Sequence, residues 1–480
     1  MPIIKVNDLI KNNFKLAPSN YKKINVDLTK LEEISRYISK IEKGAEVGSQ
    51  EYVEISNFNF LRTAAFNEKT FSLKIDNNSL INITPKSFIN SKLKKDDILI
   101  CKDSNVGEVA ILYEDMEKTM YSAGINKIIF KDHPKYFFAL MKNDNFKEQL
   151  NNMIPKGSTI KHAKDLYLRC KVPIVTNKEV IRYIEDLVDI IVNKEMKIKI
   201  KKDKIDKYIE NEICTKQNKE NYTFKYPTVK DIKKINRLDT GNYTNEFKEI
   251  EYKIKNYKNG FFYIEEDKIK GGNTPKDRYI DKKGNLKFLW IIPTFINDDG
   301  TIIDDTRINC EKNNINENCC LIINRTSKGG SGEYVGITSF YDYKEKGKAQ
   351  HNQGIYKVFN YSDKKLVFIT CLLNSPMYRK ICANLSMGSK MKELKLKNFL
   401  QIPFPNFDEK NINYIYELYT KKINKKTTDK NEFKKDNIDK DDKSGILEIY
   451  KSMKKAKQKL NDTVNELYHG KNVEIKYEVF

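Results

Sequence analysis

Residues 181–213 read IRYIEDLVDIIVNKEMKIKIKKDKIDKYIENEI, and this stretch organises the rest of the chain. It contains neither Gly nor Pro, and its apolar residues recur at steps of three and four, the spacing of a heptad seam. At about 1.5 Å per residue, a helix over 179–212 would extend roughly 50 Å. We interpret it as a spacer between two globular halves; an ordinary core helix of one large domain is the alternative.

A second long helix is predicted over 445–469, closed by Gly470. Its heptad seam makes it a natural antiparallel partner for the central helix, although packing on its own domain is also consistent with the pattern. The seam residues expected to form the spacer, or to meet a partner, are Ile184, Val188, Ile191, Ile198, Ile205, Met453, Leu460 and Leu467.

The charge balance favours a polyanionic partner. Lys and Arg number 88 against 66 Asp and Glu, which gives a formal charge of +22. Such an excess favours nucleic acid, because each neutralised phosphate releases counterions. A Lys-, Asn- and Ile-rich coding bias would raise the charge without any function. No segment resembles a signal peptide or a membrane span, so we expect a cytoplasmic protein without membrane contacts.

Cysteine usage gives no sign of a metal site. The chain has eight cysteines, none in a C-x-x-C pair and none beside a histidine at ligand spacing. Reduced and mostly buried thiols are the expectation for a cytosolic chain.

The 480 residues suit two to four domains. In the first half we predict helices over 28–41, 134–143 and 145–153, with strands over 97–101, 109–112 and 127–130. In the second half we predict helices over 245–256, 364–373, 377–385 and 409–423, with strands over 288–292, 320–323 and 334–337. Residues 424–444 are mostly Lys, Asp, Asn and Thr, and we interpret them as a flexible link.

The two halves repeat one order of features. The turn YSAGI at 121–125 corresponds to QHNQGI at 350–355, the strand and turn over 98–107 to 321–330, and the helix pair over 134–153 to 362–385. The pattern predicts an α+β chain of two repeated domains, 1–176 and 223–408, with a central helical spacer over 177–222. A helical region over 409–480, including the link, completes the antiparallel coiled-coil spacer.

The repeated series resembles the specificity subunit of Type I restriction–modification systems over nearly the whole chain. The second half carries RLD at 237–239, KGGNTP at 270–275, NRTS at 324–327, GS at 388–389 and IPFP at 402–405. The first half carries LAPSNY at 16–21, KG at 43–44, LICK at 99–102, GST at 157–159 and VP at 172–173. One departure is that Gly44 is followed by Ala45 and Glu46, without the Thr-Pro of the second copy.

This resemblance implies a non-catalytic subunit with two target-recognition domains, each reading half of a split double-stranded DNA target. It implies that long helices set the gap and dock DNA methyltransferase subunits, two for each specificity subunit, and that a restriction and translocation subunit joins them. No cofactor is expected in this chain. S-adenosylmethionine, ATP and Mg²⁺ would belong to the partner subunits.

The candidate DNA-binding residues lie in the predicted turns, where side chains can reach base edges and phosphates. Arg325 suits guanine and Asn105 suits adenine. The complete candidate set is Lys102, Ser104, Asn105, Thr159, Lys161, His162, Thr274, Lys276, Arg278, Tyr279, Arg325, Thr326, Ser327, Lys328, Lys390 and Lys392. A solvated surface turn is the alternative for each of them.

No catalytic constellation is evident in the sequence. There is no Pro-Pro dipeptide for an Asn-Pro-Pro-Tyr type loop and no phosphate-binding loop, and the four histidines are scattered. A single-chain sequence-specific endonuclease built from scattered carboxylates is one rival interpretation. A basic nucleic-acid-binding scaffold without sequence preference is another.

Overall fold

The computed structural model describes residues 26–155, 162–218, 222–235, 238, 240–281, 286–297, 300–303, 306–325, 334–388, 391–424 and 428–480. The chain divides into two compact units. The first comprises residues 1–199 and 422–480, and the second comprises residues 200–421. Both units mix helices with small sheets, which confirms the α+β class.

The central helix α4 spans Lys178–Thr215, 38 residues and therefore about 57 Å. Glu179 in its first turn complements the helix dipole. Up to Ile191 the helix is buried on several sides, with Tyr183, Leu187 and Ile190 buried beside the seam. Beyond Ile191, the buried apolar residues of the helix are the seam residues Ile198, Ile205, Ile209 and Ile213. The predicted helix is confirmed.

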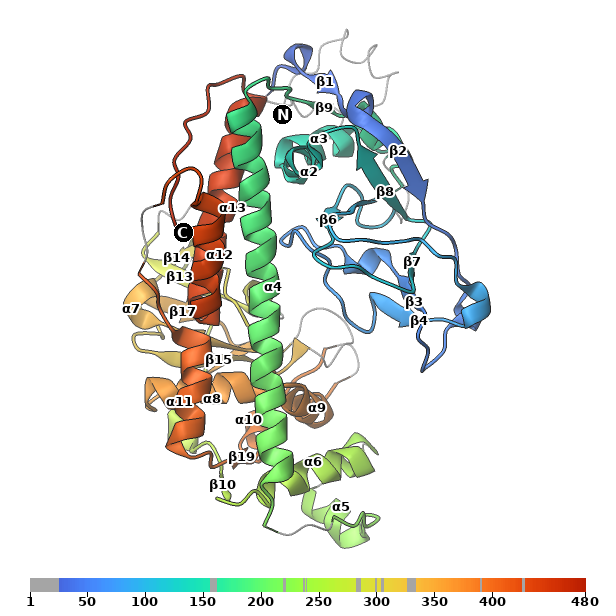
Figure 1. Cartoon of the computed structure of the whole chain (residues 1–480). Coiled ribbons are helices and arrows are strands. Elements are labelled where there is room, and N and C mark those ends of the chain that lie inside the picture. The colour runs from blue at the N-terminus through green and yellow to red at the C-terminus, as the bar shows by residue number, and fades with distance from the viewer. Residues whose placement is uncertain are drawn as a thin grey trace. The chain divides into compact units, whose positions relative to one another are not determined.

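Three helices of the first unit pack together: the first part of α4, α12 (Phe433–Lys443) and α13 (Ile446–Tyr468) (Figure 1). Lys434 of α12 pairs with Asp189 of α4, and Asp441, further along α12, pairs with Lys194, further along α4. The two helices therefore run parallel. The chain reverses its direction at Ser444 and Gly445, so α13 runs antiparallel to α4. Lys457 of α13 forms an ion pair with Glu195 of α4. The predicted antiparallel pairing is confirmed within this unit.

The flexible link predicted over 424–444 is wrong in its second part. Residues Phe433–Lys443 form α12, and Phe433 is fully buried against Tyr183, Tyr477 and Phe480. The composition misled because α12 buries polar groups instead of an apolar stripe. Asp441 pairs with Lys194, and Asn437 bonds the backbone of Phe480 and Glu478.

The sheets of the first unit are small. One four-stranded sheet has the order β2-β8-β5-β6, formed by Ile38–Lys43, Ile125–Phe130, Ile98–Cys101 and Val109–Ile111. A three-stranded sheet has the order β4-β3-β7, formed by Leu80–Asn82, Asn59–Leu61 and Thr119–Tyr121. The pair β3 and β7 is parallel. Two short strands, β1 (Glu32–Glu33) and β9 (Lys171–Val172), pair separately.

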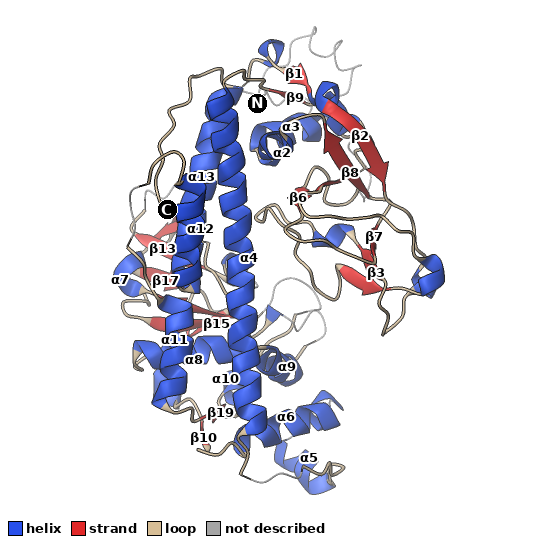
Figure 2. Ribbon diagram, viewed as in Figure 1, coloured by secondary structure: helices blue, strands red, loops and turns tan. Residues whose placement is uncertain are grey.

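Helices α2 (Pro134–Lys142) and α3 (Asp144–Met153) follow β8 (Figure 2). Their bounds agree with the prediction. Nearly every residue of α2 is buried, since the strands lie on one side of it and α13 contacts it through Tyr468 and Leu140.

The second unit repeats this topology, with one additional edge strand, β12, in its other sheet. Its four-stranded sheet β11-β18-β15-β16 is formed by Ile269–Gly271, Ile355–Val358, Cys319–Ile323 and Thr338–Tyr341. Its other sheet, β12-β14-β13-β17, is formed by Tyr279–Asp281, Arg307–Asn309, Phe288–Ile291 and Ala349–His351, with β13 and β17 parallel. Strands β10 (Phe261–Phe262) and β19 (Phe404–Pro405) pair as β1 and β9 do. The duplication predicted from the sequence is confirmed.

The helices of the second unit repeat too. α8 (Asp363–Asn374) and α9 (Pro376–Leu385) match α2 and α3, and α11 (Glu409–Thr420) follows β19 as α4 follows β9. The ring of Tyr208 in α4 packs against that of Tyr414 in a tilted arrangement, and its hydroxyl donates to Asn411 Oδ1, so α11 packs on the last part of α4. The remaining helices are α5 (Val229–Ile235), α6 (Asn245–Lys255), α7 (Tyr343–Lys346) and α10 (Leu396–Phe399).

Two predicted elements are wrong. Residues 28–41 form short turns and strands instead of a helix, because β2 completes the sheet as an edge strand against β8 over Ile38–Lys43. This tertiary pairing overrides a local pattern that suited either state. The strand predicted over 334–337 is a turn around Gly336, whose φ is +90°, and β16 begins at Thr338. The predicted domain boundaries stay predictions.

Candidate nucleic-acid interface

The two units share one backbone framework around the ends of their central strands. Gly44 N–H donates to Ile125 O at 3.1 Å in the first unit, and Gly272 N–H donates to Ile355 O at 3.1 Å in the second. After β5, Lys102 N–H donates to Gly124 O at 2.8 Å; after β15, Asn324 N–H donates to Gly354 O at 3.0 Å.

A third segment joins each framework from further along the chain. Ala163 N–H donates to Lys102 O in the first unit, and Leu394 N–H donates to Asn324 O in the second, both at 2.8 Å. Three segments distant in sequence therefore meet at one place in each unit.

Gly44 and Gly272 are required by the close approach of these segments. A Cβ on Gly44 would lie 2.1 Å from Ser122 O, and a Cβ on Gly272 would lie 2.2 Å from Asn352 O. Both clashes are with backbone atoms that the sheet fixes, so a side chain at either position would push the segments apart. The pair of Lys-Gly motifs in the sequence thus marks equivalent structural positions.

The loop after β5, residues 102–107, holds three of the candidate residues. Its tight turn is closed by Gly107 N–H donating to Cys101 O at 2.8 Å, with Ser104 in the left-handed region at φ +63°. The carboxylate of Asp103 lies 2.7 Å from Nδ1 of His162, which brings the predicted residue His162 beside this loop. Ser104, Asn105 and His162 are exposed, and Lys102 is half-buried.

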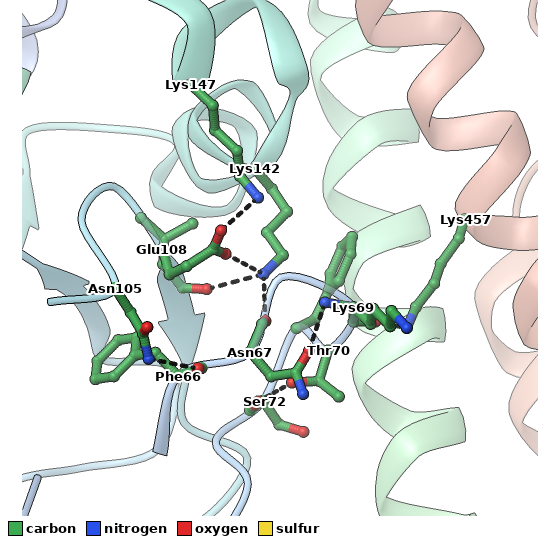
Figure 3. A network of polar contacts seen from close by, with 12 residues as sticks. Phe66, Asn67, Lys69, Thr70, Ser72, Asn105, Glu108, Lys142, Lys147 and Lys457 are labelled. Atoms are coloured by element: carbon green, nitrogen blue, oxygen red, sulfur yellow. Dashed lines mark hydrogen bonds and ion pairs between the residues drawn. The ribbon is translucent and has the colours of Figure 1, made fainter. Parts of the chain in front are cut away.

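The side chain of Asn105 holds its own loop in place. Its Nδ2 group donates to Thr63 O at 3.1 Å. It also donates to Phe66 O at 3.2 Å (Figure 3). The nitrogen of the amide expected to face an adenine is therefore engaged with the neighbouring segment, whereas the amide oxygen accepts no side-chain hydrogen bond from the described residues.

A buried cation supports the same segment. Nζ of Lys142 donates to Asn67 O, Glu108 Oε2 and Val109 O at 3.0–3.3 Å, and Lys147 reaches the other oxygen of Glu108 at 2.7 Å (Figure 3). Burial lowers the pKa of Lys142 to about 8, although the charge of Glu108 opposes the shift.

Glu195 of α4 binds the next residues of this segment. Its carboxylate accepts from Phe71 N–H and from the N–H and hydroxyl of Ser72, at 2.7–3.0 Å, and pairs with Lys457 at 2.7 Å. Burial alone would raise the pKa of Glu195, but Lys457 and the Ser72 hydrogen bonds outweigh it, and the pKa is lowered. Glu195 interrupts the apolar seam, and this contact explains why.

The loop after β15 begins with an ion pair at the equivalent position. Nη2 of Arg325 lies 2.6 Å from Oε1 of Glu393. An isolated bridge joins Arg325 and Glu393, as another joins Asp103 and His162. In the second unit the cation, Arg325, lies on the loop after the strand, and the carboxylate, Glu393, lies on the third segment. In the first unit the carboxylate, Asp103, lies on the loop, and the imidazole of His162 lies on the third segment.

The turn between β11 and β12 presents the third candidate group. Lys276, Arg278 and Tyr279 are exposed, and Tyr279 retains 68% of its accessible surface on the edge strand β12. Arg278 donates to Pro275 O, and the hydroxyl of Thr274 donates to Oε1 of Gln353 at 2.5 Å. An exposed aromatic ring next to cationic side chains in the sequence is a combination that can bind nucleic acid.

Not every candidate lies within the described part of the chain. Thr159, Lys161, Thr326, Ser327, Lys328 and Lys390 lie outside the described residues. Lys392 is half-buried one residue before Glu393. The spacer candidates Ile184, Val188, Ile191, Ile198, Ile205, Met453, Leu460 and Leu467 are all buried. The proposed roles of both sets stay predictions.

Two residues of this region, Glu393 and Gln353, were not predicted from the sequence. Nothing local marks Glu393, because its partner Arg325 is 68 positions away. A signal for Gln353 did exist, since the repeat aligns QHNQGI with YSAGI and so places Gln353 opposite Ala123.

The described residues hold no cluster of three or more His, Cys, Asp or Glu side chains suited to a metal ion. All eight cysteines are free thiols. In the same part of the chain, no helix combines the length and apolar character of a bilayer-spanning segment.

No protein-family model and no curated protein matches this chain. Among solved structures, it is similar to the Type I restriction–modification S subunit from M. genitalium, at 12% identity and a TM-score of 0.39, over 96% of this chain and 99% of that one. It is also similar to the HsdS subunit from Thermoanaerobacter tengcongensis, at 11% identity and a TM-score of 0.28, over 92% and 96%. A third match, at 12% and 0.29 over 92% and 97%, comes from a study of complex assembly in the type I R-M system.

Proposed function

We propose that this chain is the DNA specificity subunit of a restriction–modification system. Each copy of the repeated framework reads one half of a split double-stranded target, and the chain directs partner methyltransferase subunits to it. One observation carries this proposal: the two units keep the same backbone hydrogen bonds and the same strand order in the four-stranded sheet, yet carry different side chains at equivalent positions of the loops. A protein that recognises two different half-sites needs the same backbone framework in both units and different side-chain contacts to the DNA.

The charges suit this role. The formal charge of +22 favours phosphate contacts, which supply much of the affinity and set the register. Sequence is then read by groups that hydrogen-bond to base edges. Such groups lie at the ends of the strands in three pairs: Asp103 with His162, Arg325 with Glu393, and Thr274 with Gln353.

The long helices set the gap between the half-sites in this proposal. α4 is a continuous helix of 38 residues without Gly or Pro, and a helix cannot shorten or bend sharply without such a break. Its seam and that of α13 hold the spacer together, while their outer faces dock the methyltransferase. Domain limits of 1–176, 177–222, 223–408 and 409–480 follow from the same division.

The chain itself is proposed to be non-catalytic and to bind no cofactor. S-adenosylmethionine would belong to the methyltransferase partner, and ATP with Mg²⁺ to a restriction and translocation partner. Two methyltransferase subunits for each chain match the two copies. A role on chromosomal DNA implies a cytoplasmic location.

The test is to map methylated adenines across the host genome with and without this gene, with the neighbouring methyltransferase expressed in both strains. The expected result is the loss of one bipartite motif, which would reveal both half-sites. An unchanged methylome would contradict the proposal. Mg²⁺-dependent cleavage by the purified chain alone would favour the endonuclease, and equal competition by unrelated duplexes would favour the basic scaffold.

A further inference from the structure

The turn between β17 and β18 carries Gln353 at a position that the first unit fills with Ala123. In both units the turn closes on itself: Ile355 N–H donates to Asn352 O at 3.2 Å, and Ile125 N–H donates to Ser122 O at 2.8 Å. Gly354 O and Gly124 O then accept from the first residue after the central strand. Gln353 and Ala123 are therefore structurally equivalent.

The backbone of Gln353 is held from several sides. Nδ2 of Asn324 donates to its carbonyl oxygen at 3.2 Å, and Oδ1 of Asn352 accepts from Gly354 N–H at 3.0 Å. A Cβ on Gly354 would lie 2.7 Å from Pro293, so the turn packs closely on the segment after β13. Base readout needs a rigid frame of this kind, because a loosely held side chain loses specificity.

The side chain of Gln353 is exposed and oriented. Its Oε1 accepts the hydroxyl proton of Thr274 at 2.5 Å, while its Nε2 donates to no described residue. An amide oxygen has two lone pairs, so Oε1 can accept a second hydrogen bond. One free acceptor site beside two free donors is the pattern that pairs with N6 and N7 of adenine in the major groove.

We propose that Gln353 reads an adenine in the second half-site, and that Ala123 contacts a thymine methyl group at the corresponding position of the first. The inference rests on the proposed DNA-reading function. Thr274 acts as a positioning residue, because it fixes the amide without itself being required to touch the base. An amide side chain in one unit and a methyl side chain in the other, at the same structural position, would then give the two units different DNA targets although their backbones are alike.

The test uses the full-length purified chain and a library of randomised DNA duplexes, with the bound fraction sequenced. The wild-type chain should enrich a bipartite motif. Gln353→Ala should relax one A·T pair of one half-site by about tenfold and leave the other half-site unchanged. Ala123→Gln should change one position in the other half-site only. Gln401→Ala, an exposed glutamine of the second unit, should leave the motif unchanged.

The outcomes separate the two claims. If the wild-type chain enriches no motif, the DNA-reading function fails and the inference with it. If it enriches a motif that Gln353→Ala leaves intact, or weakens equally at all positions, only the inference fails. The melting temperature of each variant should match the wild type, because each side chain lies on the outside of its turn. The turns themselves are held by the backbone, by Asn324 and Asn352 in the second unit, and by Ser122 in the first.

Discussion

Arg325 and Glu393 form an ion pair of 2.6 Å at the end of β15, where the first unit has Asp103 and His162. The pair is about one-third exposed, so its own contribution to stability is small. It orients the guanidinium instead. We expect Arg325→Ala to relax one base pair of the second half-site, at a cost of about 1–3 kcal/mol there.

Selection from randomised duplexes measures this effect. Glu393→Gln is the matched variant, because it removes the competing carboxylate and keeps the arginine, so the base preference should stay and overall affinity should rise. Uniform weakening by Arg325→Ala across all sequences would identify a phosphate contact instead.

Lys142 predicts an unusual dependence of stability on pH. Its pKa is about 8 in the folded chain and about 10.5 when unfolded. Between these values the unfolded chain binds more protons, so this residue makes stability rise with pH. Relative to Lys142→Met, the wild-type free energy of unfolding should increase by roughly 2 kcal/mol from pH 7.5 to 9.5.

Denaturant unfolding at several pH values checks this. Subtracting the Lys142→Met curve removes the contribution of tyrosines, which titrate near the upper end of the window. Lys147→Met, which removes the other lysine on Glu108, should retain the slope. Parallel wild-type and Lys142→Met curves would show that folding does not lower the pKa of Lys142.

The buried pair of Lys194 and Asp441 joins α4 to α12, with Nζ 2.8 Å from both carboxylate oxygens and both side chains essentially inaccessible. Burial lowers the pKa of Lys194 and raises that of Asp441. Removing one partner leaves an uncompensated buried charge, so Lys194→Met should cost about 3–5 kcal/mol.

The double variant Lys194→Met with Asp441→Leu should recover most of that loss, because an apolar pair needs no desolvated charges. Urea unfolding of the two single variants and the double variant forms a complete cycle. Additive losses in the double variant would show that the two groups do not act as a pair.

A length change in α4 tests the spacer. Seven residues inserted near Lys201 add about 10 Å, which is about three base pairs of DNA. A flexible insertion after Asn424 should accompany it, since the chain returns between the units there. Methylome mapping should then show both half-sites intact and the gap lengthened. An unchanged gap would exclude the helix as the ruler.

Long, uninterrupted periodic segments were predictable from the sequence, as α4, α13, α8 and α9 show. The duplication was predictable as well, because the motifs occur in the same order in both halves, although each motif alone is weak. Two of the three wrong elements have one physical origin. Residues 38–41, predicted as helix, form strand through pairing with β8, and 433–443, predicted as a flexible link, form helix through buried polar contacts with α4 and the last residues of the chain. Both depend on partners far away in sequence.

The candidate interface was predictable to the level of loops but not of side chains. Lys102, His162 and Arg325 do lie where three segments meet. The engagement of Asn105 with Thr63 and Phe66, and of Arg325 with Glu393, follows from segments that the sequence does not place together.

The glycines pressed against backbone carbonyls at Gly44 and Gly272 have a consequence for how such a protein changes over time. Selection for a folded chain acts on these two glycines and on the buried strands, whereas the turns beside them tolerate substitution. Mutations at positions such as 123, 325 and 353 can therefore accumulate without loss of a folded chain. On the proposed function, each unit could therefore acquire a new DNA target independently of the other, while the shared backbone framework stays unchanged.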